Sequence, residues 1–167
     1  MNSPTLPVTL ALPSEEDTAT LAERIGAQAG PGDVLLLSGP IGAGKTHFAR
    51  ALIRARLAEQ GLVEDIPSPT FTLVQSYEAG PLEIWHADLY RLTHPDEVVE
   101  LGLTDAFETA LCLVEWPDRL GALAPPTALR LDFAALPEGG HRVTLSGDAA
   151  WAERLAGIIK DFTHAEP

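Results

Sequence analysis

Short apolar runs alternate along the chain with longer segments in which apolar residues recur every three or four positions. The runs at residues 34–37 (VLLL) and 111–114 (LCLV) are too short for helices and are typical of strands buried on both faces. Further strands are predicted at residues 5–12, 71–77, 83–92, 128–133 and 141–146.

Helices are predicted between these strands. The first begins at Ser14, where Asp17 three residues later resembles a capping box, and it ends at the GPG of residues 30–32. The other predicted helices lie at about residues 45–60, 95–101, 104–110 and 151–162. Because strands alternate with helices, we expect residues 1–167 to form a single α/β domain with a largely parallel sheet.

Composition narrows the range of functions. The 24 acidic and 11 basic residues give a net charge of −13, and an acidic surface repels phosphate backbones. We therefore expect no binding to DNA and only indirect action on RNA. The N-terminus is a poor signal peptide, and no apolar run approaches the roughly 20 residues that span a bilayer. The single cysteine, Cys112, lies in an apolar run and is expected to be buried. These features predict a cytoplasmic protein without a membrane segment.

The segment at residues 39–46, GPIGAGKT, matches the phosphate-loop pattern G-x-x-x-x-G-K-[ST] in full. A buried strand is predicted before it and an amphipathic helix after it, as the motif requires. Its glycines allow successive main-chain N–H groups to face phosphate oxygens. Lys45 is expected to bridge the β and γ phosphates, and the Thr46 hydroxyl is expected to bind Mg²⁺.

A phosphate loop also needs a carboxylate for the metal at the end of a nearby strand, and the chain offers two. Glu115 ends the apolar strand LCLVE, whereas Asp88 ends the more polar IWHAD. Either acid could instead be structural, Glu115 as a surface acid and Asp88 as a turn cap. His86 shares a strand face with Asp88, and packing in the core is its simpler interpretation.

The nucleotide is expected to be ATP. Guanine-specific GTPases read the base with an Asn-Lys-x-Asp motif, and the only asparagine here is Asn2. The residues DRLG at 118–121 match a GTPase Asp-x-x-Gly pattern, but Pro117 interrupts the approach to it.

Together with the phosphate loop, three further segments resemble motifs of the TsaE (YjeE) family: residues 68–74 (SPTFTLV), 86–92 (HADLYRL) and 114–117 (VEWP). That family consists of small bacterial P-loop ATPases needed to form threonylcarbamoyladenosine in tRNA. The resemblance covers nearly the whole chain. It implies a P-loop NTPase-like, three-layer α/β fold, with antiparallel strands flanking a largely parallel central sheet.

The resemblance also implies roles for matching positions. Nucleotide-binding residues would be Gly39, Gly42, Ala43, Gly44, Lys45, Thr46, Glu15 and Trp116. Thr46 and Glu115 would hold Mg²⁺. The catalytic residues would be Lys45, Asp88 and Thr70, with Asp88 on the strand next to the phosphate loop and Thr70 in a segment similar to a switch that senses the γ-phosphate. Glu15 would lie at the helix start that approaches the adenine.

Two residues depart from the family pattern. Pro40 stands where the family usually has Asp, and it supplies no N–H to a phosphate. His47 stands where the family usually has a second hydroxyl residue. Neither change removes a necessary group.

The leading functional hypothesis is an ATPase that acts as a switch on protein partners, which the resemblance names as TsaB and TsaD. A small-molecule kinase is the alternative, although the nine arginines are scattered and form no lid segment. A nucleotide-binding regulator without turnover is a third possibility.

Overall fold

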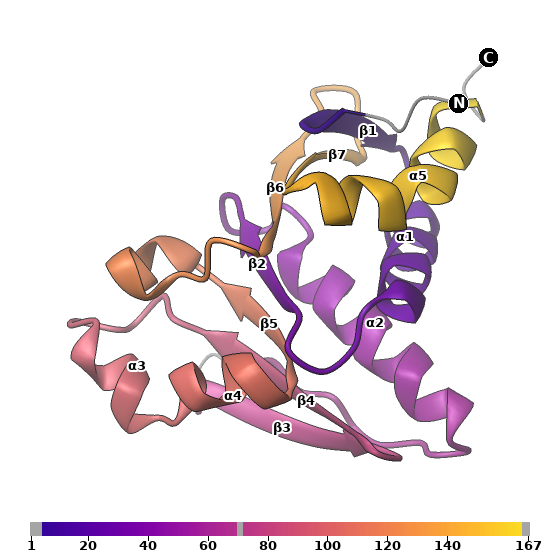
Figure 1. The fold of residues 1–167 in the computed structure, drawn as a ribbon. Helices are drawn as coiled ribbons and strands as arrows, with labels where there is room; N and C mark the ends of the chain where they lie inside the picture. The colour runs from indigo at the N-terminus through magenta and orange to yellow at the C-terminus, as the bar shows by residue number, and fades with distance from the viewer. Residues whose placement is uncertain (1–4, 70–71, 165–167) are drawn as a thin grey trace.

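The computed structural model describes residues 5–69 and 72–164, which form a seven-stranded sheet with helices on both faces (Figure 1). The strands are β1 (Val8–Leu12), β2 (Val34–Ser38), β3 (Val74–Ala79), β4 (Leu82–Asp88), β5 (Leu111–Glu115), β6 (Leu129–Ala135) and β7 (His141–Ser146). The helices are α1 (Glu15–Gln28), α2 (Lys45–Glu59), α3 (Asp96–Glu100), α4 (Leu103–Thr109), the 3₁₀-helix η1 (Pro117–Leu123) and α5 (Ala149–His164).

The sheet has the order β1-β7-β6-β2-β5-β4-β3. Its centre, β6-β2-β5-β4, is parallel, whereas β7 and β1 at one edge and β3 at the other pair antiparallel. The continuous apolar strands β2 and β5 lie in this parallel centre, where both faces are covered. The predicted fold class, with antiparallel strands flanking a largely parallel sheet, is confirmed.

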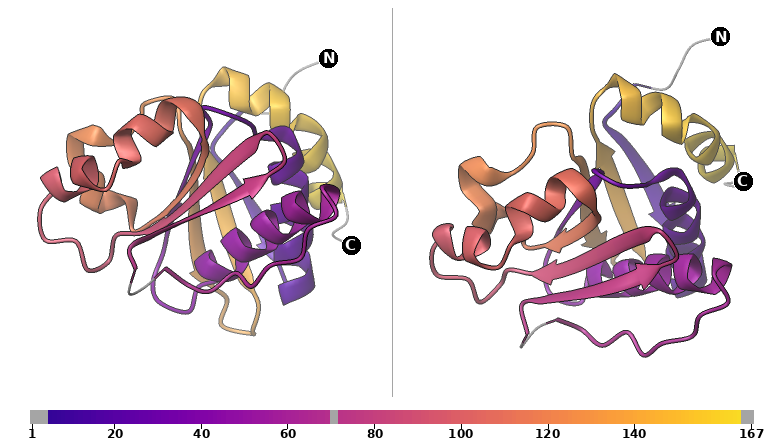
Figure 2. Two further views of the ribbon diagram at one scale, coloured as in Figure 1. Left: turned by 90° about the horizontal axis from the view of Figure 1, so that it is seen from below. Right: turned by 60° about the horizontal axis from the view of Figure 1, so that its bottom comes forward.

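Helices cover the two faces of the sheet in separate groups (Figure 2). One core packs α1, α2 and α5 against side chains such as Leu35 and Leu37 of β2. The other packs α3, α4 and η1 against Val34 and Leu36, which alternate with the first pair along the same strand. This arrangement is the three-layer architecture expected from the sequence.

Several elements differ from their predicted bounds. The strand predicted at residues 83–92 ends at Asp88, because the chain turns there and the Asp88 Oδ1 atom accepts a hydrogen bond from the Tyr90 N–H (3.0 Å). The last helix begins before residue 151, since Asp148 accepts from the N–H of Trp151 (3.0 Å) and caps its first turn. The helix η1 was not predicted, although Pro117 at its start is a known beginning signal. The capping box of Ser14 and Asp17 is present.

Cys112 is fully buried in β5, as expected, and burial raises the pKa of its thiol to about 12. Since the thiolate is the nucleophile, the folded protein should resist alkylation by iodoacetamide at about pH 8, well below that pKa and near the ordinary thiol value. Mass spectrometry would follow the reaction, with denatured protein as the reactive control. Rapid alkylation of the folded chain would contradict this burial.

In the described part of the chain, no helix is long and apolar enough to cross a membrane.

Candidate functional site

The phosphate loop joins the end of β2 to the start of α2. Its backbone depends on glycine, because Gly39, Gly42 and Gly44 have φ values of 135°, 81° and 107°. A Cβ atom on Gly39 would lie 2.5 Å from the carbonyl oxygen of Phe133, so a side chain there would force the loop away from β6. Helix α2 begins at Lys45, directly after Gly44, and its N-terminus therefore points into the loop.

Lys45 is nearly buried, with 4% of its surface exposed. Its Nζ atom donates a hydrogen bond to the Gly39 carbonyl oxygen (2.5 Å) and lies 3.5 Å from the ring centroid of Trp116. Burial lowers the pKa of Lys45, while the charges of Glu115, Asp88 and Asp118 oppose this effect. The ammonium group is thus held inside the loop by contacts that a phosphate could replace.

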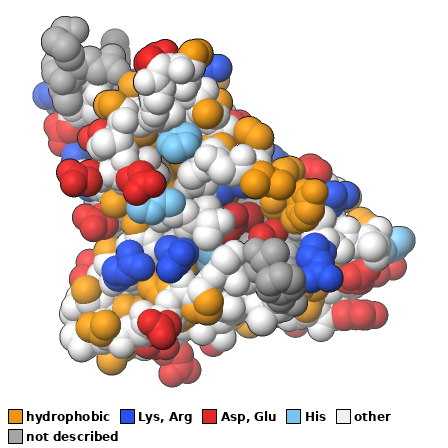
Figure 3. Space-filling model, turned by 180° about the vertical axis from the view of Figure 1, so that it is seen from behind, with side chains coloured by type: hydrophobic (Ala, Val, Ile, Leu, Met, Phe, Trp, Pro, Cys, Tyr) orange, Lys and Arg blue, Asp and Glu red, His pale blue; other side chains and the backbone are white. Residues whose placement is uncertain are grey.

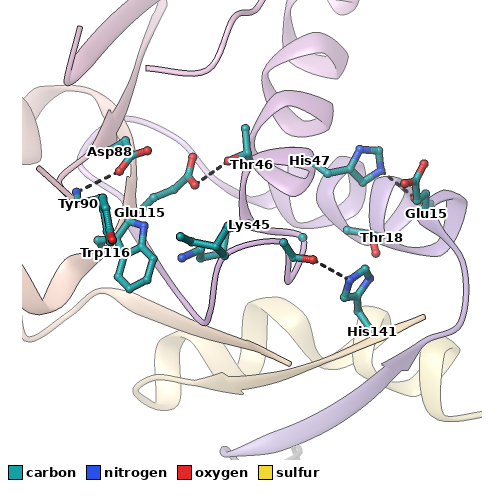
Figure 4. A pocket seen from close by; sticks show the side chains of 13 residues that line it. Glu15, Thr18, Lys45, Thr46, His47, Asp88, Tyr90, Glu115, Trp116 and His141 are labelled. Carbon is teal, nitrogen blue, oxygen red and sulfur yellow. Dashed lines mark hydrogen bonds between the residues drawn. The ribbon is translucent and has the colours of Figure 1, made fainter. Parts of the chain in front are cut away.

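Glu115 faces the start of α2 from the end of β5. Its Oε1 atom accepts a hydrogen bond from the Thr46 hydroxyl (2.7 Å), and its Oε2 atom lies 2.6 Å from the Nε2 atom of His86 (Figure 4 shows the contact with Thr46). Glu115 has 2% of its surface exposed and is not the surface acid that was the alternative reading. The structure therefore places a carboxylate beside the hydroxyl of the phosphate loop, as P-loop metal chemistry requires.

Asp88 lies on β4 opposite Glu115 of β5 in the parallel register. The expectation that Asp88 lies on the strand next to the phosphate loop is wrong, because β5 lies between β4 and β2, the strand that leads into the loop. Burial raises the pKa of Asp88, a hydrogen bond from the Tyr90 N–H lowers it, and the nearby Glu115 raises it further. Asp88 also acts as the turn cap that was the alternative interpretation, because its Oδ1 atom accepts the hydrogen bond from the Tyr90 N–H.

The other end of the site is built from α1, α2 and β7. The main-chain oxygen of Glu15 accepts a hydrogen bond from the Nε2 atom of His47 (3.0 Å), so His47 points away from Lys45 and toward α1 (Figure 4). His141 of β7 lies 3.3 Å from the carbonyl oxygen of Gly42 and supports the loop from the opposite side. Thr18 is buried, and its hydroxyl has no hydrogen-bond partner among the described residues.

These groups line one pocket of about 460 Å³. Of the predicted residues, Glu15, Gly42, Gly44, Lys45, Thr46, Asp88, Glu115 and Trp116 line it. The Gly39 carbonyl oxygen instead accepts the hydrogen bond from Lys45. Ala43 belongs to the loop, but its side chain is buried in the core. Thr70 lies outside the described residues.

Sequence reasoning did not assign Thr18, Tyr90 or His141 to the site. Tyr90 packs against Trp116 with 4.9 Å between ring centroids, and its place in the HADLYRL segment was an available signal. No sequence signal pointed to Thr18 or His141. Thr18 enters the pocket from α1, and His141 enters it from β7, about a hundred residues beyond the loop.

The arrangement defines a class of protein: an α/β fold in which a phosphate loop joins a central parallel strand to a helix, with an acid at the end of the neighbouring strand. The sequence model described as "Threonylcarbamoyl adenosine biosynthesis protein TsaE" matches residues 12–143, and the chain belongs to the TsaE family.

Two relatives illustrate the similarity. Both are named tRNA threonylcarbamoyladenosine biosynthesis protein TsaE. The protein of Rickettsia felis is 34% identical over 158 residues, which cover 95% of this chain and 88% of the relative. That of Bacillus subtilis is 38% identical over 132 residues, covering 78% and 80%. A crystal structure of Bacillus subtilis YdiB superimposes with a TM-score of 0.73 at 24% identity, covering 99% of this chain and 100% of that one, which supports the fold.

Proposed function

We propose that this protein is a single-domain, cytoplasmic, Mg²⁺-dependent ATPase of tRNA threonylcarbamoyladenosine formation, which acts as a switch on TsaB and TsaD. The observation that carries the proposal is the 2.7 Å contact between Thr46 and Glu115 at the start of α2, inside a complete phosphate loop. The relatives named as TsaE proteins of this pathway support the biological setting.

The residues fit a magnesium ion bound together with a nucleotide. Mg²⁺ keeps several waters and is usually held by few protein oxygens plus substrate phosphates. The Thr46 hydroxyl and the Glu115 carboxylate are such oxygens. Among the described residues, no group of three or more His, Cys, Asp or Glu could hold a metal ion by itself.

The chain's own residues would divide the work of hydrolysis. Lys45 would leave the Gly39 oxygen and the Trp116 ring to contact the phosphates, and the N–H groups of the loop would hold their oxygens. Bound Mg²⁺ would neutralise charge on the transferred phosphoryl group. The Asp88 carboxylate, whose raised pKa favours proton acceptance, would orient a water and take its proton.

The opposite end of the pocket would receive the nucleoside. Glu15 and Thr18 lie there on the first two turns of α1, and His47 ties the start of that helix to α2. The buried Thr18 hydroxyl is a hydrogen-bonding group that a ribose or base could satisfy. This placement agrees with Glu15 as the residue that approaches adenine.

Action on tRNA is proposed to be indirect. The net charge of −13 opposes binding to a polyanion. On the face shown in Figure 3, basic side chains are interspersed with acidic, hydrophobic and histidine side chains and form no continuous stripe. An acidic surface is suited instead to a basic face of a protein partner, where opposite charges speed encounter.

Comparison of ATPase rates with and without TsaB and TsaD tests this proposal. The isolated protein is expected to hydrolyse ATP slowly and the assembled complex faster, with stimulation weakening as salt rises, because exposed charges are screened beyond about 8 to 10 Å. Labelled tRNA titrated with the isolated chain at about 0.1 M salt should show no tight binding. Tight tRNA binding, or a rate indifferent to the partners, would overturn the proposed switch.

A further inference from the structure

His86 of β4 and Glu115 of β5 form a buried pair on the side of the sheet that packs against α2. The His86 Nε2 atom lies 2.6 Å from the Glu115 Oε2 atom, and the two residues are 0% and 2% exposed. His86 lies on the same face of β4 as Ile84 and Asp88, since alternate residues of a strand share a face. That face packs toward α2, which carries Thr46.

Each oxygen of the Glu115 carboxylate has its own partner. Oε1 accepts from the Thr46 hydroxyl (2.7 Å), and Oε2 contacts His86. The partners belong to α2, which contacts β5, and to β4, which pairs with β5 in the sheet. Donors on both oxygens determine the plane of the carboxylate, whereas Thr46 alone would leave it free to rotate about the Oε1 contact.

The hydrogen-bonding pattern defines the protonated nitrogen of His86. A carboxylate accepts hydrogen bonds, so Nε2 carries the hydrogen. The Nδ1 atom is buried and has no partner in the described part of the chain. A hydrogen on Nδ1 would therefore be a buried, unpaired donor, whereas a hydrogen on Nε2 is paired with the Glu115 carboxylate.

We infer that His86 is a positioning residue that holds the Glu115 Oε2 atom, so that Oε1 is the oxygen presented to a metal beside Thr46. The inference rests on the proposed function, because it assigns Glu115 to Mg²⁺. Packing alone requires no nitrogen at this enclosed position, whereas orientation of a metal-binding carboxylate requires a donor there. Partners of this kind typically alter metal affinity about 10- to 100-fold.

Calorimetry of ADP binding, with Mg²⁺ and with EDTA, separates orientation from packing. His86→Leu should weaken Mg²⁺ binding to the ADP-bound protein by about 10- to 100-fold, and ADP affinity in EDTA should remain that of the unchanged protein. His86→Gln, whose amide can reach Glu115 in place of Nε2, should recover most of the loss. His86→Asn, whose amide is too short to do so, should behave like His86→Leu and replaces it if that variant does not fold.

Ile84→Ala provides a matched control for stability. Ile84 is fully buried two residues earlier on the same face of β4, and its loss leaves the His86 contact in place. This variant should lower the thermal unfolding temperature without changing Mg²⁺ affinity. In the unchanged, metal-free protein, ¹⁵N chemical shifts of His86 should report a hydrogen on Nε2.

The outcomes distinguish this inference from the proposed function. Unchanged Mg²⁺ affinity in His86→Leu and His86→Asn overturns the positioning role. The role is also overturned if Ile84→Ala loses as much Mg²⁺ affinity as the His86 variants do for the same drop in unfolding temperature. An Nδ1–H tautomer overturns it without any variant. If the unchanged protein binds neither ADP nor Mg²⁺, the proposed function fails, and the positioning role fails with it.

Discussion

Replacement of Lys45 by alanine is expected to abolish productive ATP binding. Lys45 supplies the ammonium group inside the loop, and its Nζ atom rests on the Gly39 oxygen and the Trp116 ring, where a phosphate could take over both contacts. Hydrogen bonds to charged groups contribute about 1.5 to 3 kcal/mol each, so the loss of even one weakens affinity by about tenfold or more. Calorimetric titration with ATP and Mg²⁺ measures this change.

The chain contains a matched control, because its only other lysine is Lys160. Lys160 is exposed on α5 and does not line the pocket, so Lys160→Ala removes the same charge from the chain without touching the site. ATP affinity should be retained in Lys160→Ala and lost in Lys45→Ala. Equal affinity and turnover in both variants would refute the assignment of this loop to ATP.

Substitutions of the two carboxylates are expected to impair different steps, nucleotide binding for one and hydrolysis for the other. Glu115→Gln should weaken Mg²⁺-dependent nucleotide binding, because Glu115 contacts Thr46 directly. The expected loss is about 1.5 to 3 kcal/mol, the contribution of a hydrogen bond to a charged group. Asp88→Asn should leave binding intact and slow hydrolysis by about 10²- to 10⁴-fold, the range for a lost general base. Magnesium titrations of ATP binding and single-turnover hydrolysis distinguish the two effects.

Stability provides an internal check on Asp88→Asn. Because burial raises the pKa of Asp88, the folded state holds its proton to higher pH than the unfolded state, and stability from this group is lost as pH rises through the folded pKa. The neutral amide of Asn keeps the bond to the Tyr90 N–H without the cost of burying an ionised carboxylate. Asp88→Asn should therefore unfold at a temperature no lower than the unchanged protein near neutral pH.

If Asp88→Asn lost the metal and Glu115→Gln did not, the roles of the two carboxylates would be exchanged.

The sequence by itself determined the features that depend on local chemistry. The phosphate loop could be found because its conformation requires glycines at set positions before a helix, and Gly39, Gly42 and Gly44 do have positive φ values. The strand at residues 111–115 could be found because a strand covered on both faces is apolar throughout. Ser14 and Asp17 predicted the start of α1 because a capping box is completed within four residues.

Only the tertiary structure decided which distant groups share the site. Thr46 and Glu115 are 69 residues apart, and their contact depends on the parallel pairing of β2 with β5. The strand order also separates Asp88 from the phosphate-loop strand by β5, which no local pattern reveals. His47 directly follows the loop motif in sequence but turns to the Glu15 oxygen on α1, and His86 gains its role from the acid on the next strand. Local patterns specify elements, whereas strand order and side-chain packing across the sheet determine which of their ends meet.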